Sequence, residues 1–532
     1  MNTLKLRMKP YIQPFERVLA LRELQAVAGA EPRVVGAVDE TSTDFEIQSP
    51  RTHIELGSRL TYWETVEHGE HSVTTEQSRR EATVNLVRNG VAIDTLLQQL
   101  PFGDKVPLPN RRCLRYGTHG LHEYRGKFFP QLVRSLINIS GTLQGGMVAD
   151  PMSGSGTTVV EAVLAGCRGH GLDMNPLSVF MGNTKVNLLS ANPDCLRAGY
   201  EQIRNELLAT EGRRKKSLIY FESLPVVDQA YLSSWFSPDV LAGLDDISCA
   251  ILHVNDERTR DFMRVSLSNI IRRVSWQKDA DLRVRKEIRL DVEIDPKREF
   301  LEEVGRSIRA VLAFLFQNGP VQNQFHITEG DARQCAKVWG ANSVDVVITS
   351  PPYATALPYL DTDRLSLCYL GLLPRPEHRT RDQQMIGNRE VSEGLRKSYW
   401  ERFRTNESML PDGVRDLIQR IDSLNATSDV GFRRRNLPAL LGKYFFDMKD
   451  VLEGIYDALK PDRHAFIVVG NNHTIAGGNR VDIQTARLLQ DIARSVGFEV
   501  AESLSMDMLV SRDIFRKNAM SSEEILALRK PT

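Results

Sequence analysis

Short apolar runs alternate with amphipathic segments of helical length in three parts of the chain, near 145–174, 324–350 and 444–506. Continuous apolar strands that alternate with helices are typical of a parallel sheet covered by helices on both faces. We therefore expect an α/β fold of about 200 residues. The predicted strands are 145–150, 168–174, 324–331, 344–350, 464–470 and 499–506, and the predicted helices are 156–166, 444–460 and 485–498.

Two long stretches interrupt this alternation, and a third region precedes it. Residues 1–105 begin with a helical pattern at Phe15–Ala28, continue with a polar, Thr- and Glu-rich region and end in a proline-rich linker. Insertions of this size in an α/β sheet usually carry specificity or lids. The expected organisation is an accessory region at 1–105, core at 110–180, an insertion at 181–325, core at 326–360, a second insertion at 361–440 and core at 441–532.

Composition narrows the class of protein further. The 532 residues are 41% hydrophobic and 26% charged, and 68 basic residues balance 68 acidic ones, so any basic surface must be local. We find neither an apolar run of about 20 residues nor a signal-peptide pattern at the N-terminus, which favours a cytoplasmic protein. The six cysteines include no C-x-x-C pair, and we predict neither a metal site nor disulfides.

The most informative motif is DPMSGSGTT at 150–158, where a strand ends, a glycine loop turns and a helix begins. Glycines allow close approach of a ligand, and a helix N-terminus offers unpaired N–H groups. Asp173 ends the next strand, 23 residues after Asp150, where an acidic residue commonly binds ribose hydroxyls. No lysine follows the glycines as it would in a P-loop. Together these features indicate a nucleoside site.

A second motif, TSPPY at 349–353, follows a predicted strand of the same sheet. The two prolines have no N–H donor and fix the backbone, so neighbouring carbonyls can point outward as acceptors. Ser350 adds a hydroxyl and Tyr353 adds a ring for stacking. Such a site can hold an exocyclic amino group and direct its nitrogen toward an electrophile without a strong base.

The pair DPMSGSGTT and TSPPY resembles the DNA amino-methyltransferases, which transfer a methyl group from S-adenosylmethionine to an exocyclic nitrogen of cytosine or adenine. The resemblance covers 118–178 and 326–360, and more loosely 440–510. It implies a class I, Rossmann-like methyltransferase sheet with two large insertions. It also implies a catalytic Ser350, Pro351, Pro352 and Tyr353, and cofactor contacts by Lys127, Phe128, Pro130, Asp150, Pro151, Gly154, Ser155, Gly156, Thr157, Asp173 and Asp331.

The first residue of the catalytic motif bears on the target base. Serine at this position resembles the cytosine-N4 enzymes, whereas adenine-N6 enzymes more often carry Asp or Asn. A cytosine-C5 enzyme needs a nucleophilic Cys after Pro, and the chain has no Pro-Cys dipeptide. We therefore expect N4 methylation of a flipped cytosine in duplex DNA, in restriction-modification or phage defence. Adenine-N6 methylation, tRNA guanine-N2 methylation and a non-catalytic DNA-binding scaffold remain alternatives.

Basic residues gather in both insertions. Residues 258–289 hold ten Lys or Arg against four Asp or Glu, interleaved with Phe262 and Trp276, and Ser266, Ser268 and Asn269 are candidate phosphate contacts. An amphipathic helix with a solvated face would give the same counts. We expect double-stranded DNA as partner, together with a cognate restriction or defence protein. The candidate DNA contacts are Arg264, Arg272, Arg273, Lys278, Arg283, Arg285, Arg379 and Arg381.

Overall fold

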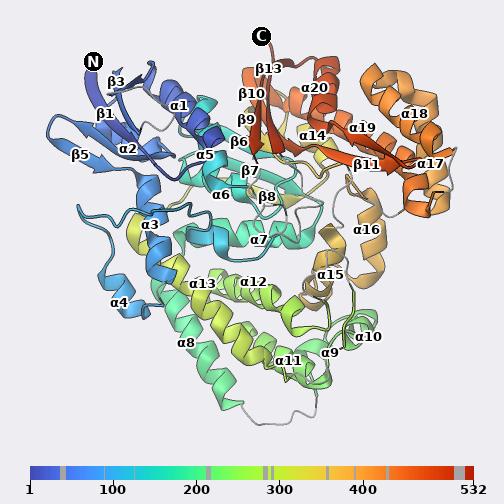
Figure 1. Ribbon diagram of the computed structural model, residues 1–532. Coiled ribbons are helices and arrows are strands. Elements are labelled where there is room, and N and C mark those ends of the chain that lie inside the picture. The colour runs from blue at the N-terminus through green and yellow to red at the C-terminus, as the bar shows by residue number, and fades with distance from the viewer. Residues whose placement is uncertain are drawn as a thin grey trace.

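The computed structural model describes residues 1–35, 43–88, 90–124, 126, 128–210, 217–278, 285–288, 293–354, 359–388, 391–426, 430–507 and 522–532. Within these ranges we find no helix that combines the length and the apolar character needed to cross a membrane. Figure 1 shows three regions around a central sheet: the N-terminal region, a helical region below, and the C-terminal helices at the right.

The central sheet has seven strands in the order β13-β14-β10-β9-β6-β7-β8. The five strands from β10 to β8 are parallel to their neighbours, while β14 runs antiparallel to both β10 and β13. This mostly parallel sheet confirms the α/β, Rossmann-like fold expected from the apolar pattern. The strands are β6 (Met147–Asp150), β7 (Arg168–Asp173), β8 (Phe325–Glu329), β9 (Val344–Thr349), β10 (Leu459–Gly470), β13 (Glu499–Asp507) and β14 (Ser522–Arg529).

The direction of the strand order reverses next to β6. The chain moves outward from β6 to β7 and β8, then returns to place β9 on the other side of β6. In open α/β sheets, ligands bind at the carboxyl ends of the strands where the order reverses. Val148 lies opposite Val346 and Ala149 opposite Val347, so the residues after β6 and after β9 emerge together at this edge.

Helices cover both faces of the sheet. On one face α5 (Pro130–Ile139) packs beside α1 (Pro14–Ala28), and on the other α19 (Phe432–Ala458) and α20 (Thr485–Val496) share a buried cluster with β9 and β10. Strand β9 is buried at every position, as its mostly apolar sequence predicts, and the buried positions include Asp345 and Thr349. The helices after β6 and β7 are α6 (Thr157–Leu164) and α7 (Pro176–Asn187), and the short α14 (Cys335–Trp339) precedes β9.

The N-terminal region forms its own five-stranded antiparallel sheet, ordered β2-β3-β1-β4-β5. Its inward side chains share one hydrophobic cluster with α5 and the central sheet, so the region is packed on the core. Strands β3, β4 and β5 lie within the polar region 39–81, where no strand was predicted, and β1 and β2 precede that region. They are β1 (Asn2–Met8), β2 (Arg33–Val34), β3 (Asp44–Ser49), β4 (Trp63–His68) and β5 (His71–Thr74), with helices α1, α2 (His53–Arg59), α3 (Glu76–Arg88) and α4 (Ile93–Gln98).

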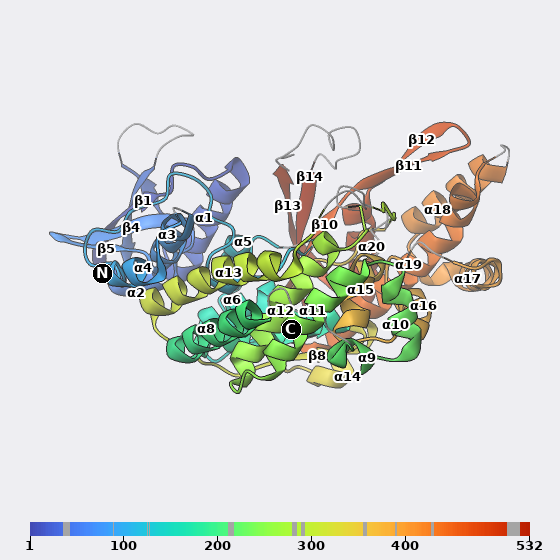
Figure 2. The ribbon, with the colours of Figure 1, turned by 90° about the horizontal axis from the view of Figure 1, so that it is seen from below.

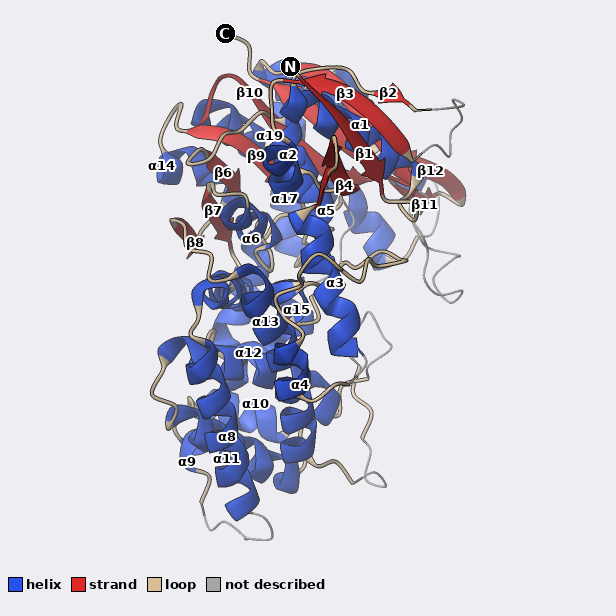
Figure 3. Cartoon of the chain, turned by 90° about the vertical axis from the view of Figure 1, so that its left-hand side faces the viewer, coloured by secondary structure: helices blue, strands red, loops and turns tan. Residues whose placement is uncertain are grey.

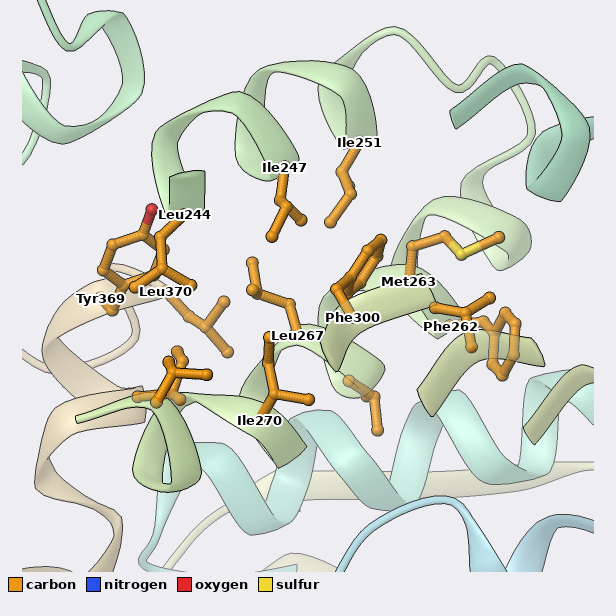
Figure 4. Close-up of a cluster of buried hydrophobic side chains, with 14 of the residues drawn as sticks. Leu244, Ile247, Ile251, Phe262, Met263, Leu267, Ile270, Phe300, Tyr369 and Leu370 are labelled. Atoms are coloured by element: carbon orange, nitrogen blue, oxygen red, sulfur yellow. The ribbon is translucent and has the colours of Figure 1, made fainter. Parts of the chain in front are cut away.

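The first insertion is helical and lies below the sheet (Figures 1 and 3). Its core is a continuous cluster in which α11, α12 and α13 meet Tyr369 and Leu370 at the end of α15 (Figure 4). The segment that follows the TSPPY motif is therefore anchored in the insertion. The helices are α8 (Pro193–Ala209), α9 (Ile219–Glu222), α10 (Val226–Ser233), α11 (Pro238–Leu252), α12 (Glu257–Val274), α13 (Pro296–Asn318) and α15 (Tyr359–Tyr369).

The second insertion adds helices beside α19 and leads into the last part of the core. Helices α17 and α18 and the hairpin β11–β12 lie together at one end of the molecule (Figure 2). The predicted helices at 156–166 and 485–498 and the predicted strands are observed near their expected bounds, whereas β14, the antiparallel strand between β10 and β13, was not predicted. The remaining elements are α16 (His378–Gln384), α17 (Glu393–Asn406), α18 (Asp412–Ala426), β11 (Asn472–Ala476) and β12 (Asn479–Ile483).

Candidate active site

The glycine loop after β6 is held by a buried carboxylate. Asp150 accepts a hydrogen bond from the backbone N–H of Met152 at 3.1 Å and from the hydroxyl of Thr158 at 2.8 Å. Burial raises the pKa of Asp150 to about 6, although the Thr349 and Thr158 hydroxyls favour the ionised form. Thr158 also contacts the Ile348 carbonyl of β9 at 3.3 Å. Asp150 thus fixes the loop and joins its helix to the strand that carries the TSPPY motif.

The two glycines of the loop meet different structural demands. Gly154 and Gly156 have φ angles of +47° and +80°, which disfavour any side chain. A Cβ on Gly156 would lie 2.8 Å from the Cα of Gly182 in α7, and one on Gly154 would lie 2.9 Å from the ring of Tyr124. The loop therefore permits close approach both to a helix behind it and to a ring in front of it.

Asp173 lies at the tip of β7 and faces this loop. Its two carboxylate oxygens accept hydrogen bonds from the backbone N–H groups of Gly154 and Asn175, each at 2.8 Å. Burial raises the pKa of Asp173 to about 6 despite these two donors. Because a carboxylate has about four acceptor sites, two remain for a ligand's hydroxyl groups. The ionised group is preorganised to receive a diol.

The surroundings of Asp173 come from three further segments. Asn175 donates to the carboxylate of Asp363 in α15 at 2.9 Å, and the Gly330 N–H donates to the carbonyl of Asp173 at 3.0 Å. Arg381 of α16 donates to the Met174 carbonyl at 2.7 Å and pairs with Glu329. Arg381, a candidate DNA contact in the sequence, is thus placed beside the nucleoside-type site.

The TSPPY motif follows β9 at the same edge of the sheet. Pro351 is buried, and Ser350, Pro352 and Tyr353 are half-buried. The Tyr353 hydroxyl donates to the carboxylate of Glu523 in β14. Burial raises the pKa of Glu523, and its hydrogen bond with Tyr353 opposes that rise. A half-buried carboxylate therefore orients the aromatic ring of the motif.

The segment that precedes the glycine loop is hydrogen-bonded to helix α12 of the first insertion. The His122 ring contacts the Ser268 hydroxyl at 3.0 Å, and the Glu123 N–H donates to the Asn269 side chain at 2.9 Å. Ser268 and Ser266 are buried. Their suggested role as phosphate contacts is therefore wrong, because these hydroxyls face the protein interior.

The other predicted cofactor residues have varied environments. Pro130 begins α5 and is buried, Phe128 is half-buried against the cluster shared with the N-terminal sheet, and Lys127 lies outside the described residues. Pro151, Ser155 and Thr157 are buried in the glycine loop. The Ser155 carbonyl accepts a hydrogen bond from buried Lys185 at 2.9 Å.

Asp331 follows β8 and is engaged by an arginine. Arg333 donates to both of its carboxylate oxygens at 2.6–3.0 Å and also to Asp447 of α19 at 2.8 Å. The backbone N–H of Arg333 is a further donor to Asp331 at 3.0 Å. Gly330, the neighbour of Asp331, donates its N–H to the carbonyl of Asp173, which places Asp331 near Asp173. Because Arg333 already donates to both carboxylate oxygens of Asp331, an adenine amino group would have to bind at the acceptor sites that remain.

The candidate DNA contacts divide into packed and exposed residues. Arg264 lies 4.7 Å over the Phe180 ring and donates to the Leu370 carbonyl at 3.4 Å, so it supports helix packing. Arg272 is half-buried, and Arg283 lies outside the described residues. Arg273 and Lys278 are partly exposed and pair with Glu299 and Glu287. Arg285 and Arg379 are exposed.

The His119 ring is buried and contacts α6, the helix that follows the glycine loop. It contacts buried Glu161 of α6 at 2.8 Å, and the Tyr116 hydroxyl donates to the same carboxylate oxygen at 2.6 Å. In the part of the chain that the structure describes, no three His, Cys, Asp or Glu side chains are grouped so as to hold a metal. This pair is framework of the core.

Sequence reasoning missed Tyr124, Asn175, Asp363 and Glu523. Asn175 and Asp363 lie close to motifs that were recognised, so proximity to Asp173 and to TSPPY was an available signal. Glu523 is 170 residues from Tyr353 and belongs to an unpredicted strand. Its role is visible only from the strand order.

Comparisons with known proteins agree with this geometry. The profile described as UPF0020, RMKL-like, methyltransferase domain, matches residues 122–190. The type II methyltransferase M.MvaI of Kocuria varians is 23% identical over 373 residues, covering 66% of this chain and 77% of that protein. M.BsoBI of Geobacillus stearothermophilus is 21% identical over 424 residues, covering 72% and 81%.

Solved structures were matched as well. TrmN of Thermus thermophilus matches with a TM-score of 0.31 and 11% identity over 100% of both chains. A DNA modification methylase of Thermus thermophilus, TTHA0409, complexed with S-adenosyl-L-methionine, matches with a TM-score of 0.20 and 16% identity over 38% of this chain and 52% of that one. The curated relatives support the coarser part of the sequence prediction, a DNA methyltransferase.

Proposed function

We propose that this chain is an S-adenosylmethionine-dependent methyltransferase that transfers a methyl group to the exocyclic N4 of a cytosine flipped out of duplex DNA. The observation that carries the proposal is the emergence of two motifs at one sheet edge. The glycine loop follows β6, and TSPPY follows the neighbouring strand β9. The Thr158 hydroxyl contacts both the carboxylate of Asp150 at the end of β6 and the Ile348 carbonyl of β9.

The residues present fit the cofactor. The turn at Gly154 and Gly156 keeps the loop free of side chains, and the Asp173 carboxylate is fixed with acceptor capacity remaining for a ribose diol. When bound, S-adenosylmethionine supplies an electrophilic methyl group on a sulfonium. Gly154, Gly156 and Asp173 would hold it beside the TSPPY motif.

The residues of TSPPY suit an exocyclic amine. Tyr353 offers its ring for stacking on the base, and Glu523 fixes the ring's direction through the tyrosine hydroxyl. The Ser350 hydroxyl and a proline carbonyl would accept the amino hydrogens, which leaves the nitrogen lone pair directed at the methyl carbon. The bound cofactor would supply the methyl group and leave as S-adenosylhomocysteine, and the amino nitrogen would release one proton to water.

The DNA surface is proposed from the exposed cations. Two short segments, which carry Trp276 and Lys278 on one side and Arg285 and Lys286 on the other, are joined by an antiparallel bridge between Gln277 and Lys286. Lys286 lies 5.0 Å over the Trp276 ring. Exposed ion pairs such as Lys278–Glu287 contribute little stability, so a cation can exchange its carboxylate partner for a DNA phosphate at small cost.

Serine at position 350 is the feature that favours cytosine N4 over adenine N6, through the resemblance to cytosine-N4 enzymes. The two relatives are named as type II methyltransferases, and we propose a restriction-modification setting for this chain.

The test uses tritiated S-adenosylmethionine with separate duplex DNA and tRNA substrates, followed by nucleoside digestion and chromatography. Label in N4-methylcytosine from DNA is expected. Label in N6-methyladenine would reject the meaning given to Ser350, and label in tRNA alone would reject DNA as substrate. Ser350→Ala and Tyr353→Ala should each lower kcat by about 100-fold or more. Ser343→Ala, on the turn before β9, is the matched control.

A further inference from the structure

A second cavity lies away from the candidate active site, with a volume of about 400 Å³. Its walls include Thr142 and Gln144, which precede β6, and Asn323, which precedes β8. These residues mark the amino ends of the strands, whereas the glycine loop and TSPPY follow the carboxyl ends. The cavity is therefore on the opposite edge of the sheet and does not belong to the site described above.

Four arginines line this cavity, against one glutamate among the described residues. Arg59 ends α2, Arg79 and Arg80 belong to α3, and Arg134 belongs to α5. The glutamate is Glu76, which accepts one hydrogen bond from Arg80 at 3.0 Å. The lining thus carries a surplus of three positive charges in a partly enclosed space, which favours an anion.

Protein partners use only part of this donor capacity. Arg59 donates to the Thr142 carbonyl at 3.4 Å, Arg134 to the Ser58 carbonyl at 3.3 Å, and Arg79 to the Phe102 carbonyl at 2.9 Å. The carbonyl ends of helices α6 and α13 also reach the cavity and offset some positive charge. These hydrogen bonds use one nitrogen each of Arg59 and Arg134, whereas Arg79 uses two, because its Nε also donates to the Thr74 carbonyl at 3.4 Å.

Three of the remaining donors, on Arg80 and Arg134, are buried and lack a partner among the described residues. Arg80 is 4% exposed, and its Nε and one terminal nitrogen have none; neither does one terminal nitrogen of Arg134, which is also 4% exposed. Buried guanidinium donors are normally hydrogen-bonded. Burial lowers the pKa of Arg80, and repulsion from the charge of Arg134 lowers it further, whereas the carboxylates of Glu76 and Glu161 partly offset this effect. A bound anion would satisfy the donors and relieve this repulsion.

We propose that this arginine cavity, lined by Arg59, Arg79, Arg80 and Arg134, binds a small phosphate-bearing anion. A planar guanidinium fork matches phosphate oxygens, and several forks converging on one space favour phosphate over a singly charged ion such as chloride. Its walls come from the N-terminal region, the core and the end of α13, so the anion would hold three parts of the chain together.

The test is isothermal titration calorimetry of the full chain with inorganic phosphate, pyrophosphate and ATP, against sodium chloride of equal ionic strength. We expect saturable binding of at least one phosphate probe with one site per chain. Arg80→Gln and Arg134→Gln should weaken it by tenfold or more, while Arg298→Gln, an exposed residue of α13, should not. Should Arg80→Gln fail to fold, Arg59→Gln, which removes a half-buried cation, tests the same cavity.

Several results separate this proposal from its alternatives. Equal affinity for the three probes assigns a single phosphate group as ligand, and tighter binding of pyrophosphate or ATP assigns a longer chain. The proposal would be overturned if Arg80→Gln gave the same binding heat as the wild type, or if S-adenosylmethionine displaced phosphate. It would also be overturned if duplex DNA alone protected the arginine cavity. Ser350→Ala should bind phosphate like the wild type, so failure of the proposed methyl transfer is distinguishable from failure of this site.

Discussion

Replacement of Gly156 by alanine tests the geometry of the cofactor loop directly. The residue has a φ angle of +80°, and a Cβ there would lie 2.8 Å from the backbone of Gly182. The left-handed conformation costs a non-glycine residue about 1–2 kcal/mol. Overpacking against an immobile backbone adds about 1–3 kcal/mol. We expect Gly156→Ala to lower the free energy of unfolding by about 2–5 kcal/mol in total.

The matched control is Gly29→Ala at the end of α1. Gly29 has a φ angle of +70°, and a Cβ added there would have no atom within 4 Å among the described residues, so this position shares the conformational cost without the clash. Urea denaturation should show that it loses only about 1–2 kcal/mol. Calorimetry should show that Gly29→Ala binds S-adenosylmethionine normally while Gly156→Ala binds it at least tenfold more weakly. Equal stability and equal affinity in the two variants would refute the close approach of loop and helix.

Three further predictions concern other parts of the site. Glu523→Gln should lower kcat about tenfold and leave the S-adenosylmethionine Kd unchanged, because the residue positions Tyr353 rather than touching the cofactor; an altered Kd with normal kcat would contradict this. Affinity for S-adenosylmethionine should be about tenfold weaker at pH 5 than at pH 8, because binding needs the ionised Asp173 and a carboxyl with a pKa of about 6 is about nine-tenths protonated at pH 5. The Asp173→Asn variant should bind the cofactor weakly at both pH values. A wild-type affinity that does not change with pH would reject the assignment. Glu161→Gln should lower the free energy of unfolding by about 3 kcal/mol, because it breaks a buried pair with His119; an unchanged urea midpoint would show that the pair is dispensable.

The sheet was largely predictable because buried parallel strands appear in the sequence as short, mostly apolar runs. All six expected strands occur near their predicted bounds, and Asp173 faces Gly154 as the spacing of the two motifs suggests. The N-terminal strands were missed because only their inward positions are apolar, which leaves an alternating, polar sequence. Ser266 and Ser268 were misjudged for a related reason: charge counts along a helix do not reveal which side chains face its buried side.

The position of β14 between β10 and β13 has a consequence for the order in which the parts of the candidate site form during synthesis. Strand β14 begins at Ser522, pairs with β10 on one side and β13 on the other, and carries the carboxylate that meets Tyr353. A chain still being synthesised therefore contains every sequence motif well before it has a complete sheet. The orientation of the tyrosine ring must await the synthesis of β14, so the TSPPY motif is made 170 residues before the carboxylate that positions its ring.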